Sequence, residues 1–515
     1  MNKKIKILSI MFFFVLIFVN SIFVGLNDKK FKMDGILFAV TLNGKTITEF
    51  PERGRYNIKI RCKNAVGKWL TEDWKFVVEN IKGDVSCSIN FTDNPQNLKT
   101  VVENNEDNLY EYKIPIYDSA VPISKSEYTN ASTIYNTSYP STTGTTTNDA
   151  FSYSEGDNLW STVPGNLLPS KYYHLVFNPP GNGYYKFCYT LFKGSTLNYI
   201  SLYVGSNSMF LDDFPSSGTY STCVDVGYIN SGSKINVVQK TTSSSSSIAK
   251  MSFNLKKVED FDVIETHYRF KGEKPNNYVW FNDELWRIIG SVPTKIDDTT
   301  TKNLVKLVRE NFIGGLAYDG KSSGYTSNWG SNTLYTLLNN YYYDGDSDNN
   351  QNATGTNYCN ARSNVIKSKC DYSLIGFSKD DYYGKMIKEV FWNNGSPSIS
   401  STSLPSEAYS KEISTKTQKG YIGLVSATDY AFANSKSEDT WNDVRKSWLY
   451  YGGEWTLSKS STNALYVSDE SVNYSKFSSY SSFVASGVRP VVYLDENVYV
   501  VSGDGTEANP YQIAM

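Results

Sequence analysis

Histidine is scarce in this chain of 515 residues, which contains only His174 and His267. Catalysis by a serine–histidine or cysteine–histidine pair therefore has few candidate bases, and both histidines are expected to be structural or exposed. The sequence also lacks a His-Glu-x-x-His motif, a glycine-rich phosphate loop and any Cys-x-x-Cys pair. These absences argue against zinc hydrolases, nucleotide-binding enzymes and structural zinc sites. We expect no catalytic residues and no cofactor.

Net charge is low as well. Lys and Arg number 50 against 52 Asp and Glu, and charged residues make up only 20% of the chain. This balance excludes a strong nucleic-acid surface. Serine, threonine, asparagine, glycine and 40 tyrosines supply the polar surface instead. Tyr and Thr favour strands, and the length predicts about three or four domains. The fold class expected is therefore mainly β and multidomain.

The N-terminus carries an export signal. Met1–Lys6 is basic, and Ile7–Leu26 contains only three polar residues. A basic start before an apolar segment of this length is typical of export to the cell surface. We interpret residues 1–26 as a signal-anchor helix that spans the membrane through residues 7–26, because no small-x-small cleavage site follows. The protein is then single-pass with an extracellular C-terminal region; if the segment is cleaved, it is secreted.

Cysteine usage agrees with export. The six cysteines occur as three separated pairs, and an even number in an exported chain predicts disulfides. Several connectivities are possible, and pairing of sequence neighbours is the simplest because each pair falls within one proposed domain. The expected pairs are Cys62 with Cys87, Cys188 with Cys223, and Cys359 with Cys370.

Two β modules are predicted in the first half of the chain. Residues 27–95 show alternating apolar and polar strands, with Asn43-Gly44 as a tight turn, and predict a small β-sandwich. The stretch Phe50–Tyr56 followed by Cys62 resembles bacterial immunoglobulin-like surface modules. Residues 96–150 are interpreted as a polar, Ser/Thr-rich connector.

Residues 151–257 again read as short strands and predict a second sandwich or jelly-roll-like module. This module is rich in aromatic residues. Aromatic rings can line a sugar-binding face, although in β proteins they more often fill cores. Carbohydrate binding by this module therefore stays an open alternative.

Residues 264–515 contain the most distinctive motifs, which are Tyr278–Phe281, Trp329–Asn339, Glu454–Ser458 and Gly487–Leu494. Together they resemble a Firmicutes-type surface-protein domain of unknown function, related to the formylglycine-generating-enzyme-like branch of the C-type lectin fold. The resemblance implies an α+β domain. The oxygenase members of that branch use two late cysteines, whereas the last cysteine here is Cys370, so their activity is not expected.

Two details follow from this resemblance. Glu454-Trp455 and Val488-Arg489-Pro490 resemble the structural signature of the family, and a buried Glu–Arg ion pair is expected to hold the loops. The tail Gly503–Ile513 is similar to a short element at the ends of modules in Gram-positive surface proteins.

One acidic cluster is a candidate metal site. Asp344, Asp346 and Asp348 alternate along a polar loop and offer hard oxygen ligands for calcium. An EF-hand is excluded because Asn349 and Gly355 stand where that loop needs Gly and Glu. A solvated loop is the alternative.

These observations favour a membrane-anchored extracellular protein that binds a glycan or protein ligand through its C-terminal domain. The stretches expected to make contact are Tyr318–Trp329 and Asn394–Ser410, which are rich in the adaptable residue types of binding surfaces. One alternative is a cell-envelope enzyme that acts on glycans with carboxylates not identified from sequence. Another is a purely structural spacer.

Overall fold

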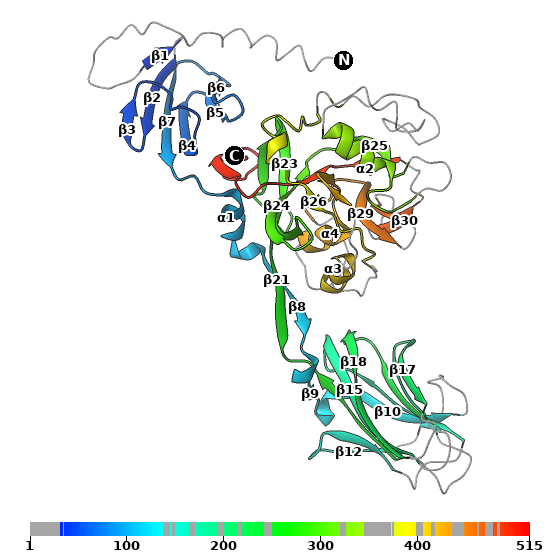
Figure 1. Ribbon diagram of the computed structural model, residues 1–515. Helices are drawn as coiled ribbons and strands as arrows, with labels where there is room; N and C mark the ends of the chain where they lie inside the picture. Colours follow the sequence, from blue (N-terminus) through cyan, green and yellow to red (C-terminus); the bar gives the residue numbers. More distant parts are fainter. Residues whose placement is uncertain are drawn as a thin grey trace.

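The computed structural model describes residues 31–33, 36–136, 145–146, 150–163, 170–193, 199–213, 218–240, 250–319, 326–343, 372, 375–397, 405–413, 418–434, 447–460, 463–468, 477–480 and 485–515. Strands dominate and form several sheets, which confirms a mainly β, multidomain chain. Figure 1 shows a first unit (within residues 31–93), a middle unit (within 116–260) and a C-terminal unit (97–115 and 261–515). The expected membrane segment lies outside the described residues, and within them no helix is long and apolar enough to cross a bilayer.

The first unit is a five-stranded sheet with a hairpin packed on it. The sheet contains β1 (Phe31–Met33), β2 (Ile36–Leu42), β3 (Lys45–Ile47), β4 (Tyr56–Lys63) and β7 (Val85–Asp93), and the hairpin is β5 (Val66–Leu70) with β6 (Lys75–Glu79). The order is β1-β2-β7-β4, with β3 beside β2 and β2 parallel to β7. The expected turn joins β2 to β3, where Asn43 and Gly44 have φ of 49° and 77°, as a two-residue hairpin requires.

The first disulfide lies within this sheet. Cys62 of β4 stands directly opposite Cys87 of β7, and the two are bonded. The disulfide of antibody domains instead joins two facing sheets. The expected pairing is therefore present, but it ties neighbouring strands together.

The middle unit is a sandwich of two antiparallel sheets, each six-stranded in the described residues. One contains β10 (Thr129–Asn136), β11 (Thr145–Thr146), β14 (Tyr172–Asn178), β16 (Tyr199–Val204), β17 (Asn207–Asp213) and β19 (Ile235–Lys240). The other contains β9 (Val121–Pro122), β12 (Phe151–Ser154), β13 (Leu159–Thr162), β15 (Gly183–Lys193), β18 (Gly218–Ile229) and β20 (Lys250–Lys257). Buried side chains from both sheets form one core, including Trp160, Phe177 and Phe187. Many of the aromatic residues here thus fill the core.

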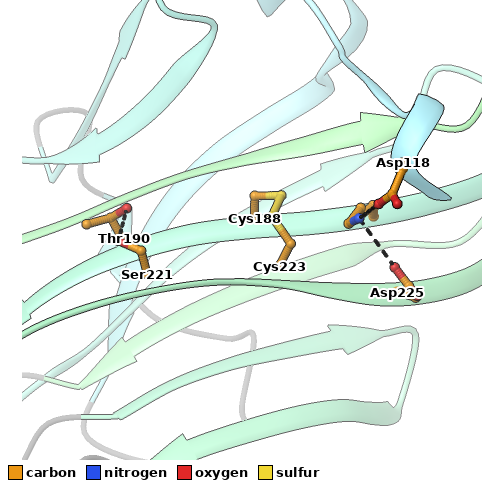
Figure 2. The surroundings of a disulfide bond; sticks show 7 residues. Asp118, Cys188, Thr190, Ser221, Cys223 and Asp225 are labelled. Atoms are coloured by element: carbon orange, nitrogen blue, oxygen red, sulfur yellow. Dashed lines mark hydrogen bonds and ion pairs between the residues drawn. A yellow bond between two sulfur atoms is a disulfide. The ribbon is translucent and has the colours of Figure 1, made fainter.

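The second disulfide joins β15 to β18 on the outer face of this sandwich. Figure 2 shows Cys188 opposite Cys223, with Thr190 and Ser221 as the next outward pair along the same strands. Phe187 and Tyr189 alternate with Cys188 and point into the core, as the two-residue period of a strand requires. The expected Cys188–Cys223 pairing is therefore present.

The middle unit is an insertion into the C-terminal unit. The chain leaves along β8 (Leu109–Pro115) and returns along β21 (Phe261–Arg269), and these two strands pair antiparallel. At the far end, the Ile116 amide donates to the Asp260 carbonyl at 3.0 Å. Figure 1 shows the resulting two-stranded ribbon between the two units.

The C-terminal unit has two larger sheets. The nine-stranded sheet has the order β28-β33-β24-β23-β22-β35-β34, with β21 beside β23 and β8 beside β21. Its other strands are β22 (Tyr278–Phe281), β23 (Glu284–Lys295), β24 (Thr301–Arg309), β28 (Ile422–Gly423), β33 (Val491–Tyr493), β34 (Tyr499–Ser502) and β35 (Tyr511–Ala514). The second sheet contains β25 (Gly314–Ala317), β29 (Glu454–Ser460), β30 (Asn463–Val467), β31 (Phe477–Tyr480) and β32 (Ala485–Val488), and β26 (Val390–Phe391) pairs with β27 (Lys419–Gly420).

Four short α-helices accompany the sheets in the described residues: α1 (Leu98–Glu103), α2 (Thr333–Leu337), α3 (Pro405–Ile413) and α4 (Ala427–Ala433). α2 lies within the Trp329–Asn339 motif. Its N-cap is Asn332, whose side chain accepts from the Tyr335 amide, and a π-turn (Leu338–Tyr342) continues it.

The connector predicted at residues 96–150 is wrong over most of its described length. Leu98 and Val102 of α1 are fully buried in the C-terminal core, and β8 belongs to the ribbon. Ile123 and Tyr128 are buried in the sandwich core, so the middle unit begins well before residue 151. A helix of six residues with two buried apolar side chains is too short to show a periodic pattern, which is why the sequence resembles a polar linker.

We expect the middle unit to be removable. Replacing Tyr117–Glu259 by Asn-Gly should leave the other units folded, because Ile116 and Asp260 are already adjacent and Asn-Gly closes two-residue hairpins. Thermal unfolding followed by circular dichroism measures the result. Removing residues 151–257 instead would leave Ile123 and Tyr128 in the chain but delete the core in which they are buried. The exposed apolar side chains should then cause aggregation. Loss of the unfolding transition in the first variant would contradict the insertion.

Candidate functional site

The C-terminal core contains a carboxylate held by two cations. Asp429 lies at the start of α4, where Ser426 and Asp429 form a capping box. Its carboxylate receives Arg269 Nη1 at 2.7 Å and also pairs with Lys306, and all three side chains are buried. Burial alone would raise the pKa of Asp429, but Lys306 and Arg269 outweigh it and hold that pKa well below its usual range. This group is a fixed anion.

A second buried ion pair lies nearby. Arg489 donates to both carboxylate oxygens of Glu454 and to the Leu449 carbonyl, and the Tyr430 hydroxyl donates to the same carboxylate. Glu454 is fully buried and Arg489 is 2% exposed. The ion pair expected from the sequence is thus present, and it ties α4, β29 and the segment after β32 together.

Glu412 of α3 is buried without a cationic partner among the described residues. The hydroxyls of Thr428 and Ser458 donate to its carboxylate. Burial raises its pKa to about 6. The cavity that it shares with Lys306, Tyr409 and Asp429 measures only about 40 Å³, enough for a water molecule or two rather than a ligand. This cluster is therefore part of the core rather than a substrate site.

Neither histidine is placed for catalysis. His267 lies in β21 between Glu265, at 3.1 Å, and Arg269, at 3.2 Å, and burial lowers its pKa to about 4. His174 lies in β14 with Nδ1 3.1 Å from the Asn236 amide oxygen, and burial lowers its pKa as well. Both rings are fully buried, so their role is structural.

Several residues named from the sequence lie outside the described residues: Asp344, Asp346, Asp348, Cys359 and Cys370. No cluster of His, Cys, Asp or Glu suited to a metal occurs in the part of the chain that is described.

The expected contact stretches are partly wrong. In Tyr318–Trp329, both end residues are at most 3% exposed, and Asp319 is fully buried and receives the Thr333 hydroxyl. In Asn394–Ser410, Asn394 is 1% exposed and receives the Trp329 amide at 3.1 Å. These four described residues are buried and are not available to a ligand.

A large cleft lies elsewhere, between the first unit and the C-terminal unit. This cleft measures about 1040 Å³, which is the scale of ligand-binding pockets. Figure 1 shows the C-terminus of the chain next to β4 of the first unit. Strand β4 and the β5–β6 hairpin form one wall, and β22, β23 and the loop from Ser502 to Gln512 form the other.

Direct contacts hold the two walls together at one end. The Thr71 hydroxyl donates to the Ile513 carbonyl at 3.0 Å, and the Tyr499 hydroxyl donates to the Gly54 carbonyl at 3.0 Å. Arg53 lies over the ring of Tyr382 at 5.1 Å. Tyr499, Val501 and Ala514 are also part of the buried cluster of the first unit. At this end, the cleft is therefore closed by direct contacts between the two units.

The first-unit wall presents cations. Lys59 and Arg61 alternate along β4 and are exposed, and neither has an ion-pair partner in the described part of the chain. Trp69 also lines this wall and is fully buried, and its indole Nε1 has no acceptor among the described residues. Lys59 and Arg61 are therefore available to a bound polar molecule, whereas the Trp69 N–H is buried inside the wall.

The opposite wall is formed by the tail, whose shape depends on two glycines. Gly503 and Gly505 have φ of 92° and 78°, which favours glycine. The Gly505 carbonyl accepts the Tyr278 amide at 2.8 Å. Asp504 closes the turn by accepting from the Thr506 amide and hydroxyl, and these bonds lower its pKa. The turn places Tyr511 in the cleft wall.

Two aromatic side chains of this wall are half exposed. Trp280 of β22 and Tyr511 of β35 lie on neighbouring parallel strands. Among the described residues, Trp280 has no ring contact, and the Tyr511 hydroxyl has no hydrogen-bond partner. The side chains of Asn57, Gln96 and Gln512 also line the cleft. The cleft thus combines aromatic faces, amides and cations.

Sequence reasoning missed this cleft because its walls come from segments far apart in the chain, with β4 (Tyr56–Lys63) and β5 (Val66–Leu70) on one side and β22 (Tyr278–Phe281) and the tail on the other. The signals that were present are the tail motif Gly503–Ile513 and the tryptophan of Tyr278–Phe281. Neither indicates which partner surface it faces.

No known protein-family model matches the sequence, and comparison with curated proteins found no relative. Among solved structures, the secreted serine protease VesC from Vibrio cholerae is 15% identical with a TM-score of 0.16, covering 36% of this chain and 32% of its own. A cycloisomaltooligosaccharide glucanotransferase from Paenibacillus sp., complexed with cycloisomaltoheptaose, is 16% identical with a TM-score of 0.14, covering 33% and 20%. The chain thus spans about a third or less of each, and similarity this low supports no assignment of fold or function.

Glu412 gives the C-terminal unit a pH-dependent stability. Its folded pKa of about 6 exceeds the ordinary 4.5, so its contribution is complete below pH 4.5 and is lost as the pH rises through 6. The expected loss is about 2 kcal/mol. Chemical denaturation at several pH values should show the stability advantage of wild type over Glu412→Gln shrinking by that amount between pH 4.5 and 7.

His267 acts in the opposite sense, because its lowered pKa reduces the stability of the fold as the pH falls from 6.5 to about 4. Both proteins share this contribution, so it cancels in the comparison. A pH-independent difference would contradict the assignment.

Proposed function

We propose that the chain is a membrane-anchored extracellular protein that binds a glycan in the cleft between the first unit and the C-terminal unit. The observation that carries the proposal is the convergence of groups without protein partners, among the described residues, on one cleft of about 1040 Å³. These groups are the ring of Trp280, the Tyr511 hydroxyl and the cations Lys59 and Arg61.

The chemistry of these groups fits a carbohydrate. Aromatic rings stack on the apolar faces of sugars, and side-chain amides such as those of Asn57 and Gln512 can both donate to and accept from hydroxyls. Lys59 and Arg61 favour a ligand with carboxylate, sulfate or phosphate groups. In this proposal the C-terminal unit is a C-type-lectin-like recognition domain, the first unit an immunoglobulin-like module, and residues 1–26 the anchor.

Binding alone is favoured over glycan hydrolysis. A glycosidase needs two carboxylates flanking the scissile bond, one with a raised pKa. The buried carboxylate with a pKa near 6, Glu412, lies in the core cluster around the 40 Å³ cavity and not in the cleft. Three acids line the cleft, Glu79, Asp504 and Glu507. Asp504 already accepts the hydrogen bonds from Thr506 that close the tail turn.

The soluble region, residues 27–515, should bind specific glycans on an array without releasing product. Trp280→Ala should weaken binding about tenfold or more, because truncating a central aromatic removes most of the stacking surface. Isothermal titration with the best array ligand measures this loss. Tyr451→Ala is the control, since Tyr451 is 44% exposed and does not line the cleft.

Unchanged affinity of Trp280→Ala would show that the ligand binds elsewhere. Release of a shortened glycan would favour the enzyme alternative. Mass spectrometry of the mature N-terminus tests the anchor, which requires that residues 1–26 be retained.

A further inference from the structure

The β8–β21 ribbon carries an unusual share of exposed apolar surface. Of the twelve exposed large hydrophobic side chains in the described residues, five belong to this ribbon. They are Leu109, Ile114, Phe261, Val263 and Ile264, with exposures from 37% to 51%. Apolar residues concentrated on one short element indicate an interaction surface rather than chance exposure.

Only one face of the ribbon is covered by the C-terminal unit. Tyr110 packs on Phe432 with ring centroids 4.5 Å apart, and Tyr112 packs on Tyr409 at 5.4 Å. Side chains alternate along a strand, so Leu109, Glu111 and Lys113 lie on the opposite face. All three of these residues are exposed.

β8 also has a free edge. Among the described strands it pairs with β21 alone, and Figure 1 shows no element along its other side. The backbone groups of an open edge favour pairing with another strand. The ribbon therefore offers an open edge with exposed apolar side chains close to it.

The sequence of β8 is complementary to itself. If a second β8 pairs antiparallel about a two-fold axis at Tyr112, Glu111 of each copy faces Lys113 of the other. Leu109 then faces Pro115, and Tyr110 faces Ile114. Every pair matches acid with base or apolar with apolar, which is the pattern that stabilises cross-strand neighbours. In the described structure, Lys113 pairs with Glu111 of the same strand at 2.9 Å.

The other edge of the ribbon does not fit a second copy. Antiparallel self-pairing of β21 at its exposed part would place Asp262 opposite Glu265, and like charges directly opposite are destabilising. The register shift between Val263 and Glu265 also interrupts that edge, and bulges of this kind prevent pairing. Only the β8 edge is suited to self-association.

We propose that two copies of this chain associate through antiparallel pairing of their β8 strands, which forms a four-stranded sheet from two ribbons. A two-fold contact of this kind is isologous and closed, so it stops at a dimer. Dimerisation would give one assembly two copies of the cleft and increase the avidity for a repetitive ligand.

Sedimentation velocity of the soluble region, residues 27–515, should detect a dimer. Lys113→Glu places four acids at the contact and should raise the dimer dissociation constant about tenfold or more, and Glu111→Lys should do the same with four cations. The double variant Glu111→Lys/Lys113→Glu restores every opposite-charge pair and should recover wild-type association. Both positions are exposed, so unchanged thermal unfolding confirms that folding is intact.

Lys75→Glu is the matched control, because the Lys75 side chain is similarly exposed and also pairs with an acid, Asp73. It lies in the first unit, so the change should leave association unchanged. A wild-type protein that remains monomeric at about 100 µM would overturn the proposal. So would a dimer that tolerates both single reversals, or a double variant that stays as weak as the single ones.

Discussion

β21 pairs with β8 along the ribbon and with β23 at its base, and the arrangement of the whole chain depends on this double pairing. It makes the middle unit an insertion and brings α1 back to the C-terminal core. Closing a loop this long costs entropy that grows only logarithmically with length. A middle unit that folds first brings Ile116 and Asp260 together and removes most of that cost. The topology therefore favours early folding of the insertion, although it separates the two halves of the C-terminal unit in sequence.

The buried charges of the C-terminal unit contribute more to the arrangement of its segments than to its free energy of unfolding. Desolvating Asp429, Lys306 and Arg269 costs several kcal/mol per ion, which their mutual attraction only offsets when the geometry is good. Each group comes from a different element, α4, β24 and β21. The Glu454–Arg489 pair likewise joins β29 to the segment after β32. Misplacing any of these elements would leave an unpaired charge in the core, so the pairs select one packing among many similar ones.

Local signals in the sequence predicted local structure well. Asn43-Gly44 correctly predicted the first hairpin, and the cysteine spacing predicted the two described disulfides. The motifs that contain Glu454 and Arg489 predicted a buried ion pair. The failures concern contacts between distant segments. Leu98 and Val102 are the two buried residues of a six-residue helix. Their packing role is evident only from the C-terminal core in which they are buried. Tyr318 and Trp329 look like binding residues from their type, but burial assigns them to the core.

The tail illustrates how one motif can serve both folding and binding. A Cβ added at Gly505 would approach the Tyr511 ring to 2.5 Å and the Asn276 carbonyl oxygen to 2.6 Å. Only glycine therefore allows the tail to lie against β22 and to place Tyr511 in the cleft wall. The same turn positions β35, whose Ile513 carbonyl accepts the Thr71 hydroxyl of the first unit. Because β35 contributes to the sheet, the interface and the cleft wall together, any ligand in the cleft contacts a surface that forms only when β35 has paired with β22.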